Sequence, residues 1–191
     1  METPPEIAAL KERIISLKRL PRFENILNIC NGKKPSRPTP FEFIINDDWG
    51  FKGQTMLPPE SLREYVFPWY CMTVESAHQA GKPVILHSCG NLGAVMEDVI
   101  DIIKIDGKHS YEDTILPVEE AYQQWGDRIG IFGGIDVNFL TIRSQNEIES
   151  RVRNLIQLSN LKGGLAIGSG NSIPEYIPVS NYCALLRATY F

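Results

Sequence analysis

The sequence predicts an α/β fold, an incomplete TIM-type (β/α)8 barrel of about five parallel strands that alternate with helices. Short apolar runs alternate with longer amphipathic segments, which is typical of βαβ units in a parallel sheet. Each run is apolar along its whole length, as expected for strands buried on both faces. A closed barrel has eight strands in about 250 residues. The chain has 191 residues, so we expect a partial barrel with two open sheet edges.

The predicted strands are the short apolar runs. Each is followed by polar residues or glycine, and they lie at 43–45, 83–86, 102–105, 129–132 and 164–167.

Apolar residues at helical spacing predict the covering helices. A helix over 62–80 should break or kink at Pro68, because proline donates no backbone hydrogen bond. Ser144 and Glu147 form the pattern of a capping box and predict a helix start. The remaining helices are expected at about 92–101, 117–125 and 179–188.

Residues 1–40 precede this alternation. Thr3 to Glu6 resembles a capped helix start, and apolar residues then recur at helical spacing until Pro21. Residues 33–40 contain three prolines and three basic residues, which indicates a loop. We therefore divide the chain into an N-terminal helical segment with a basic, Pro-rich loop (1–40) and a partial barrel (41–191).

Composition and charge narrow the class of protein. Hydrophobic residues make up 43% and charged residues 22%, an ordinary globular composition. The net charge of −4 makes nucleic acid a poor partner, because its binding needs a basic surface. We expect no membrane span and no signal peptide, because no apolar run reaches about 18 residues and the first twenty residues carry several charges. Four cysteines without a leader then predict thiols or metal ligands in a cytoplasmic protein.

Polar side chains suited to catalysis follow the predicted strands. In (β/α) barrels the active site forms at this end of the sheet, from several strands at once. The residues concerned are Asp47, Asp48, His87, Cys89, His109, Asp136 and Asn171.

Five segments, in chain order over about 41–191, resemble the C-terminal part of uroporphyrinogen decarboxylase-like proteins. They are 47–51 (DDWGF), 82–91 (KPVILHSCGN), 108–114 (KHSYEDT), 126–136 (from GDR to GGID) and 168–174 (GSGNSIP). Residues 31–38 are similar to the start of the same proteins, so the chain resembles a member that lacks the middle of its barrel. The resemblance implies a (β/α)8 barrel that either decarboxylates uroporphyrinogen or moves methyl groups between corrinoid proteins and thiols.

His87 and Cys89 are the candidate zinc ligands. Side chains two apart on a strand point the same way, and imidazole and thiolate both suit zinc. In the methyltransferases that the chain resembles, a His-x-Cys pair and a distant cysteine bind zinc. That distant position looks like Asn171, a poor ligand, so the third ligand is left open between Asp47 and Asp48. The alternatives are that the pair binds nothing, or that His87 acts without a metal.

His109 is a second candidate catalytic residue. With Glu112 and Asp113 it is expected to form an acid–base group, because a nearby carboxylate raises the pKa of histidine. The alternative is a solvated loop histidine, with Asp113 or Thr114 capping the next helix.

The remaining candidates are polar or aromatic residues near the same end of the sheet. Asp136 is interpreted as a catalytic carboxylate or a turn residue. Trp49 belongs to an aromatic group that either lines a pocket for a flat macrocycle or, as we favour, packs helices against the barrel. The predicted substrate-binding residues are Trp49, Asn91, Ser169 and Asn171.

Three functions remain open. The first is zinc-assisted methyl transfer between a corrinoid, carried by a partner protein, and a thiol or small methyl donor. The second is decarboxylation of uroporphyrinogen, a tetrapyrrole whose carboxylates call for arginines that residues 41–45 lack. The candidate catalytic residues for either enzyme are Asp47, Asp48, His87, His109 and Asp136, and in a metal-free decarboxylase Asp47 or Asp48 would be the central polar group. The third is a truncated, non-catalytic or partner-binding subunit that self-associates through its open sheet edges.

Overall fold

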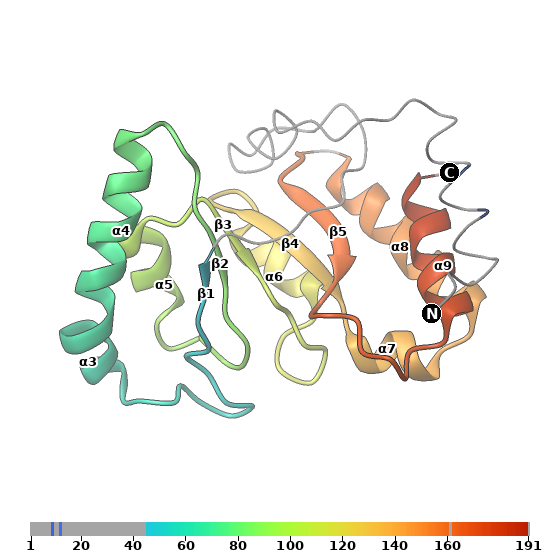
Figure 1. Ribbon diagram of the computed structural model, residues 1–191, viewed down its shortest axis with the longest axis horizontal. Helices are drawn as coiled ribbons and strands as arrows, with labels where there is room; N and C mark the ends of the chain where they lie inside the picture. Colours follow the sequence, from blue (N-terminus) through green and yellow to red (C-terminus); the bar gives the residue numbers. More distant parts are fainter. Residues whose placement is uncertain (1–8, 10–11, 13–44, 161, 191) are drawn as a thin grey trace.

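One parallel sheet organises the protein. The structure is a computed structural model that describes residues 9, 12, 45–160 and 162–190. Its strands are β1 (Ile45–Asn46), β2 (Ile85–His87), β3 (Gly107–His109), β4 (Gly130–Ile135) and β5 (Leu165–Ser169). Each strand pairs with the next in the chain, in the order β1-β2-β3-β4-β5 (Figure 1). This is the strand order of a (β/α) barrel, and the predicted fold class, an open and incomplete barrel, is confirmed.

Helices connect the strands. They are α3 (Pro59–Ser61), η1 (Leu62–Val66), α4 (Phe67–Gln79), α5 (Met96–Asp98), η2 (Val99–Ile103), α6 (Val118–Trp125), α7 (Val137–Ile142), α8 (Gln145–Ser159) and α9 (Val179–Tyr190), where η marks a π-helical segment. Figure 1 shows α4 and α5 on the β1 side of the sheet, and α8 and α9 beyond β5. The predicted N-terminal segment 1–40 lies outside the described residues, apart from positions 9 and 12.

The predicted strand at 102–105 is wrong. Ile102 and Ile103 belong to the helical segment η2, and strand β3 begins only at Gly107. Ile103 is buried whereas Ile102 is 57% exposed, and the segment ends at Lys104, whose φ of 64° is left-handed. A run of β-branched residues is typical of a strand. Here the run belongs to a helical segment and buries only one side of it.

The capping box and the break near Pro68 are found where the sequence predicts them, and one short helix is additional. Ser144 and Glu147 form the predicted capping box at the start of α8. The expected break near Pro68 is the change from η1 to α4: the two segments are continuous, and Pro68 near the start of α4 cannot donate a backbone hydrogen bond to the preceding turn. The short helix α7 was not predicted from the sequence.

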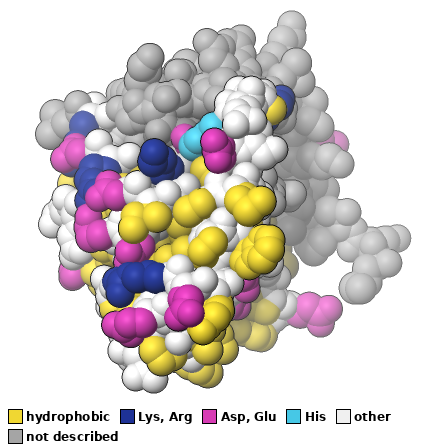
Figure 2. Space-filling view, turned by 90° about the vertical axis from the view of Figure 1, so that its left-hand side faces the viewer, with side chains coloured by type: hydrophobic (Ala, Val, Ile, Leu, Met, Phe, Trp, Pro, Cys, Tyr) yellow, Lys and Arg dark blue, Asp and Glu magenta, His cyan; other side chains and the backbone are white. Residues whose placement is uncertain are grey.

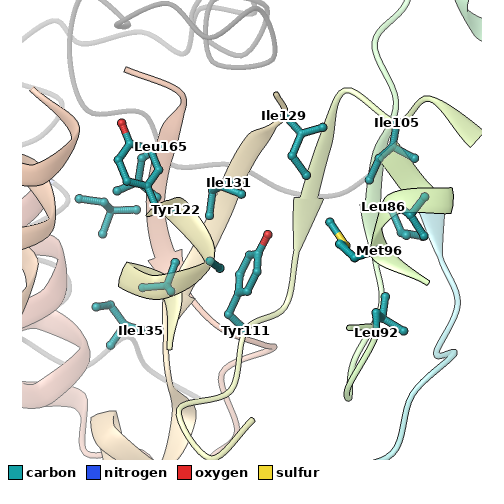
Figure 3. Close-up of a cluster of buried hydrophobic side chains, with 14 of the residues drawn as sticks. Leu86, Leu92, Met96, Ile105, Tyr111, Tyr122, Ile129, Ile131, Ile135 and Leu165 are labelled. Carbon is teal, nitrogen blue, oxygen red and sulfur yellow. The ribbon is translucent and has the colours of Figure 1, made fainter. Parts of the chain in front are cut away.

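Strand register separates the core from the face that carries the histidines. Leu86, Lys108 and Ile131 are cross-strand partners on β2, β3 and β4, and His87 pairs in the same way with His109. Successive side chains of a strand point to opposite faces. Leu86 and Ile131 therefore join the apolar cluster beneath the helices (Figure 3), whereas the two histidines lie on the other face.

Hydrophobic side chains also reach the surface beside α4. Figure 2 views this side of the molecule, where apolar side chains lie among charged ones. Tyr65, Trp69 and Met72 follow one another at helical spacing and are each more than 60% exposed. None of the helices within the described residues is long and apolar enough to cross a membrane.

The core contains one buried hydroxyl group that lacks a partner among the described residues, that of Tyr111. Its side chain lies among Met96, Ile131 and other apolar residues (Figure 3), and burial raises the pKa of the phenol. The buried hydroxyl of Tyr122, in contrast, donates to the carbonyl of Gly163.

We predict that Tyr111→Phe raises the free energy of unfolding by about 1 kcal/mol, because it removes an unsatisfied buried polar group. Tyr122→Phe is the matched control and should lower this free energy by about 1 kcal/mol, since it deletes a formed hydrogen bond. Urea unfolding of the three proteins measures both changes. A loss of stability in Tyr111→Phe would contradict the assignment.

Candidate metal centre

Asp48, His87 and Cys89 come together at the carboxyl ends of β1 and β2. One donor atom of each residue lies within 4.8 Å of the other two. Cys89 Sγ is 3.5 Å from His87 Nε2. Two ligands bound tetrahedrally to one zinc ion, at about 2.0–2.3 Å from it, stand roughly 3.3–3.8 Å apart. The side chains therefore fit a zinc site with three protein ligands, with Asp48 as the carboxylate ligand.

A close backbone contact brings Asp48 beside Cys89. Gly90 has a φ of +80°, and a Cβ built on it would lie 2.2 Å from backbone atoms of Gly50. Only glycine fits this crossing of the loops after β1 and β2. The amide of Cys89 then donates to the Asp48 carboxylate at 2.9 Å. The loop contact thus holds one candidate ligand against another.

Two further donors face the sulfur of Cys89. Ser110 Oγ donates to Sγ at 3.3 Å, and Asn171 Nδ2 donates to it at 3.2 Å. Burial raises the pKa of the Cys89 thiol, and these two hydrogen bonds oppose that rise. Asn171 thus reaches the centre as a donor to a ligand.

Lys108 fastens the ends of β2 and β3 to each other. Its Nζ donates to the carbonyls of Ser88 at 3.1 Å, His109 at 3.3 Å and Ser110 at 2.7 Å. The side chain is buried, and burial lowers its pKa to about 8. Ser110 has a left-handed φ of 81°, a strained conformation in which its carbonyl accepts from Lys108. The sequence alone indicates no such role for Lys108, because a lysine side chain is usually solvated.

His109 lies directly beside His87. The two Nδ1 atoms are 2.7 Å apart, the rings stack with centroids 4.9 Å apart, and His109 Nε2 is 2.9 Å from the carbonyl oxygen of Ser169. His109 is 2% exposed, and burial lowers its pKa to about 3.

The expected acid–base group around His109 does not form. Glu112 accepts from the amide of Gly90, and Asp113 pairs with Arg151. The expectation of a raised pKa is wrong, because burial lowers the pKa of His109 and the hydrogen bond to the Ser169 carbonyl opposes this only in part. The alternative of a solvated His109 beneath a capped helix is also wrong, since the histidine is buried and Pro117 occupies the N-cap of α6.

Two of the predicted catalytic carboxylates are occupied by other contacts. Asp47 accepts hydrogen bonds from Trp49 Nε1 at 2.8 Å and from the Tyr70 hydroxyl at 2.7 Å. Asp136 caps α7 through Oδ1, while its Oδ2 accepts from the amide of Asp113 at 2.9 Å. These contacts keep Asp47 apart from the cluster of Asp48, His87 and Cys89, and they fix Asp136 as a cap.

The predicted substrate-binding residues separate in the structure. Trp49 is buried and packs against Phe67 and Tyr70, as the packing interpretation expects. Ser169 contributes its backbone carbonyl to the His109 contact, and Asn91 accepts from the amide of Gly93.

A cleft of about 710 Å³ opens beside the centre, and Cys89 and Asn171 contribute to its wall. Lys52 and Tyr176, which the sequence analysis did not single out, also line it.

Residues 43–190 match the model of the family described as uroporphyrinogen decarboxylase (URO-D). A methyltransferase from Methanosarcina mazei has a similar fold, with a TM-score of 0.57 and 20% sequence identity. The match covers 70% of this chain and 37% of that chain, so the present chain spans little more than a third of that methyltransferase. No curated protein matches the chain. The family match extends over most of the sequence, to the last residue of α9, and the chain therefore belongs to the uroporphyrinogen decarboxylase family.

Proposed function

We propose that this protein is a zinc-dependent methyltransferase that acts between a corrinoid and a thiol or small methyl donor. The observation that carries the proposal is the convergence of a carboxylate, an imidazole and a thiol in Asp48, His87 and Cys89. Three protein ligands with one open position are the usual arrangement of catalytic zinc. When bound there, zinc would supply Lewis acidity that ionises a substrate thiol.

The residues around the three ligands have definite tasks in this proposal. Asn171 and Ser110 direct donors at Cys89 Sγ, which stabilises the ionised form that binds a metal. The cleft beside Cys89 would admit a substrate to a metal held there. In this proposal the thiol would lose its proton to solvent, the methyl group would pass from the methylated corrinoid to the sulfur, and the electron pair of the broken bond would stay on the corrinoid's cobalt.

A corrinoid protein is the proposed partner. The methyltransferase from Methanosarcina mazei, similar in fold, is compatible with this choice of activity. Because the present chain spans 37% of that protein, its activity and partner stand here as proposals for this chain.

The lining of the cleft disfavours the decarboxylase alternative. A tetrapyrrole with many carboxylates calls for several cations, and Lys52 is the only lysine or arginine among the described residues that line this cleft. The described Arg151, for example, is paired with Asp113 and Glu119 outside it.

The open sheet supports a role in association as the other alternative. Strands β1 and β5 are the two edges of the described sheet, and unpaired edges favour pairing with another chain. The expected partner at these edges is a second copy of this chain.

We expect purified wild-type protein to bind about one zinc ion per chain, and Cys89→Ser and His87→Ala to lose it. Asp48→Asn should weaken zinc binding by at least the roughly 10–100-fold seen for outer-shell changes. Asp47→Asn is the matched control: it makes the same charge change one residue away, and its affinity should equal that of the wild type. Metal analysis and competition with a chelator measure these values. Equal losses in Asp47→Asn and Asp48→Asn would refute the ligand assignment.

The activity itself is tested with methylcobalamin and mercaptoethanol. We expect the zinc-loaded wild type to speed the loss of methylcobalamin, followed by its absorbance, and Cys89→Ser to abolish the effect because a ligand is missing. A zinc-loaded protein that leaves the rate unchanged, yet releases carbon dioxide from uroporphyrinogen, would favour the decarboxylase instead.

A further inference from the structure

Three groups from three strands form a line of hydrogen bonds that ends at the candidate metal centre. The carbonyl oxygen of Ser169 on β5 lies 2.9 Å from His109 Nε2 on β3. His109 Nδ1 lies 2.7 Å from Nδ1 of His87 on β2. The other nitrogen of His87, Nε2, lies 3.5 Å from Cys89 Sγ.

The chemistry of the first group determines where each proton sits. A backbone carbonyl only accepts, so His109 Nε2 must carry a proton and donate it. A neutral imidazole has a single N–H, so His109 Nδ1 is an acceptor. His87 Nδ1 must then carry the proton of the central bond, and His87 Nε2 keeps its lone pair.

We propose that His109 is a positioning residue that holds His87 as the tautomer with its proton on Nδ1 and its lone pair on Nε2. This proton placement follows from the hydrogen bonds that join Ser169, His109 and His87. The consequence for metal binding rests on the proposed function: Nε2 is the nitrogen that faces Cys89, and a zinc ligand needs a free lone pair.

The surroundings hold the line of hydrogen bonds in place. Both histidines are buried, and their rings stack at an interplanar angle of 27°. Gly133 on β4 has a φ of +83°, and a Cβ built there would lie 2.6 Å from the His109 ring. Glycine at this position leaves room for the ring to pass over β4 and reach Ser169 on β5. Burial also disfavours a second proton on the His109 ring, so the imidazole is neutral and can accept at Nδ1.

Nitrogen NMR of the metal-free protein tests the proposal directly. The chain has three histidines, and long-range coupling between ring protons and ring nitrogens shows which nitrogen of each carries the proton. In the wild type we expect His87 to be protonated on Nδ1 and His109 on Nε2. A His87 protonated on Nε2 would overturn the proposal. Spectra of a His78→Gln variant identify the third ring, which pairs with Asp106 at the surface.

Two variants of His109 test its role against a merely structural one. His109→Leu removes the acceptor, so His87 should lose its preference for Nδ1–H, and zinc affinity should fall by about 10–100-fold. In His109→Gln the amide oxygen accepts from His87 and the amide nitrogen donates to Ser169. This variant should recover the Nδ1–H tautomer and most of the affinity. Failure of His109→Gln to restore the tautomer, in a protein that still unfolds cooperatively, would count against the proposal.

The two hypotheses fail separately. Wild-type protein with His87 protonated on Nδ1 but no affinity for zinc would support the role of His109 and refute the proposed function. Zinc binding by a protein whose His87 carries its proton on Nε2 would support the function and refute the role of His109.

Discussion

The candidate centre depends on one buried ammonium group. Lys108 donates to three carbonyls, and two of these belong to Ser88 and Ser110. Ser88 separates His87 from Cys89, and Ser110 is the residue that donates to the sulfur of Cys89. A buried charge is costly unless it is hydrogen-bonded, and an ammonium has three protons to donate. The three carbonyls therefore satisfy the cation and join the ends of β2 and β3 around it.

A second constraint, independent of the first, brings in the carboxylate. Within the described residues, β1 pairs with β2 at Ile45 and Asn46, and the amide of Asp47 donates to the carbonyl of His87 just beyond them. Beyond the sheet, the loops after β1 and β2 stay in contact where Gly50 crosses Gly90. The backbone amide of Cys89 then donates a hydrogen bond to the Asp48 carboxylate. Two adjacent contacts therefore hold the candidate metal centre together. One is the set of Lys108 hydrogen bonds, and the other is the close packing of Gly50 on Gly90.

The sequence predicts the order of elements and the end of the sheet that carries chemistry, because apolar runs and the polar residues after them are local patterns. It does not predict which side chains meet.

Proximity along the chain suggests that His109 interacts with Glu112 and Asp113. In the structure, strand register pairs His109 with His87, and burial keeps the imidazole neutral. The sequence also leaves the third metal ligand open between Asp47 and Asp48, because it does not fix the register of β1. A shift of one residue turns a side chain at the end of a strand to the opposite face. The strand expected at 102–105 failed for another reason, since β-branched composition does not distinguish a short helix from a short strand.

Asp48 changes the character of the proposed centre. A second cysteine at the position of Asn171 would bring a second thiolate; in the proposed centre the Asp48 carboxylate would take its place, while Asn171 donates to Cys89. Both ligands carry one negative charge, so the charge of the zinc ion is balanced in either case. A carboxylate donates less electron density than a thiolate, so a substrate thiol should ionise more readily at this centre. Because the nucleophilicity of a thiolate falls with its pKa, the ion formed there should attack a methyl group less strongly, and the centre should depend more on close positioning of its two substrates.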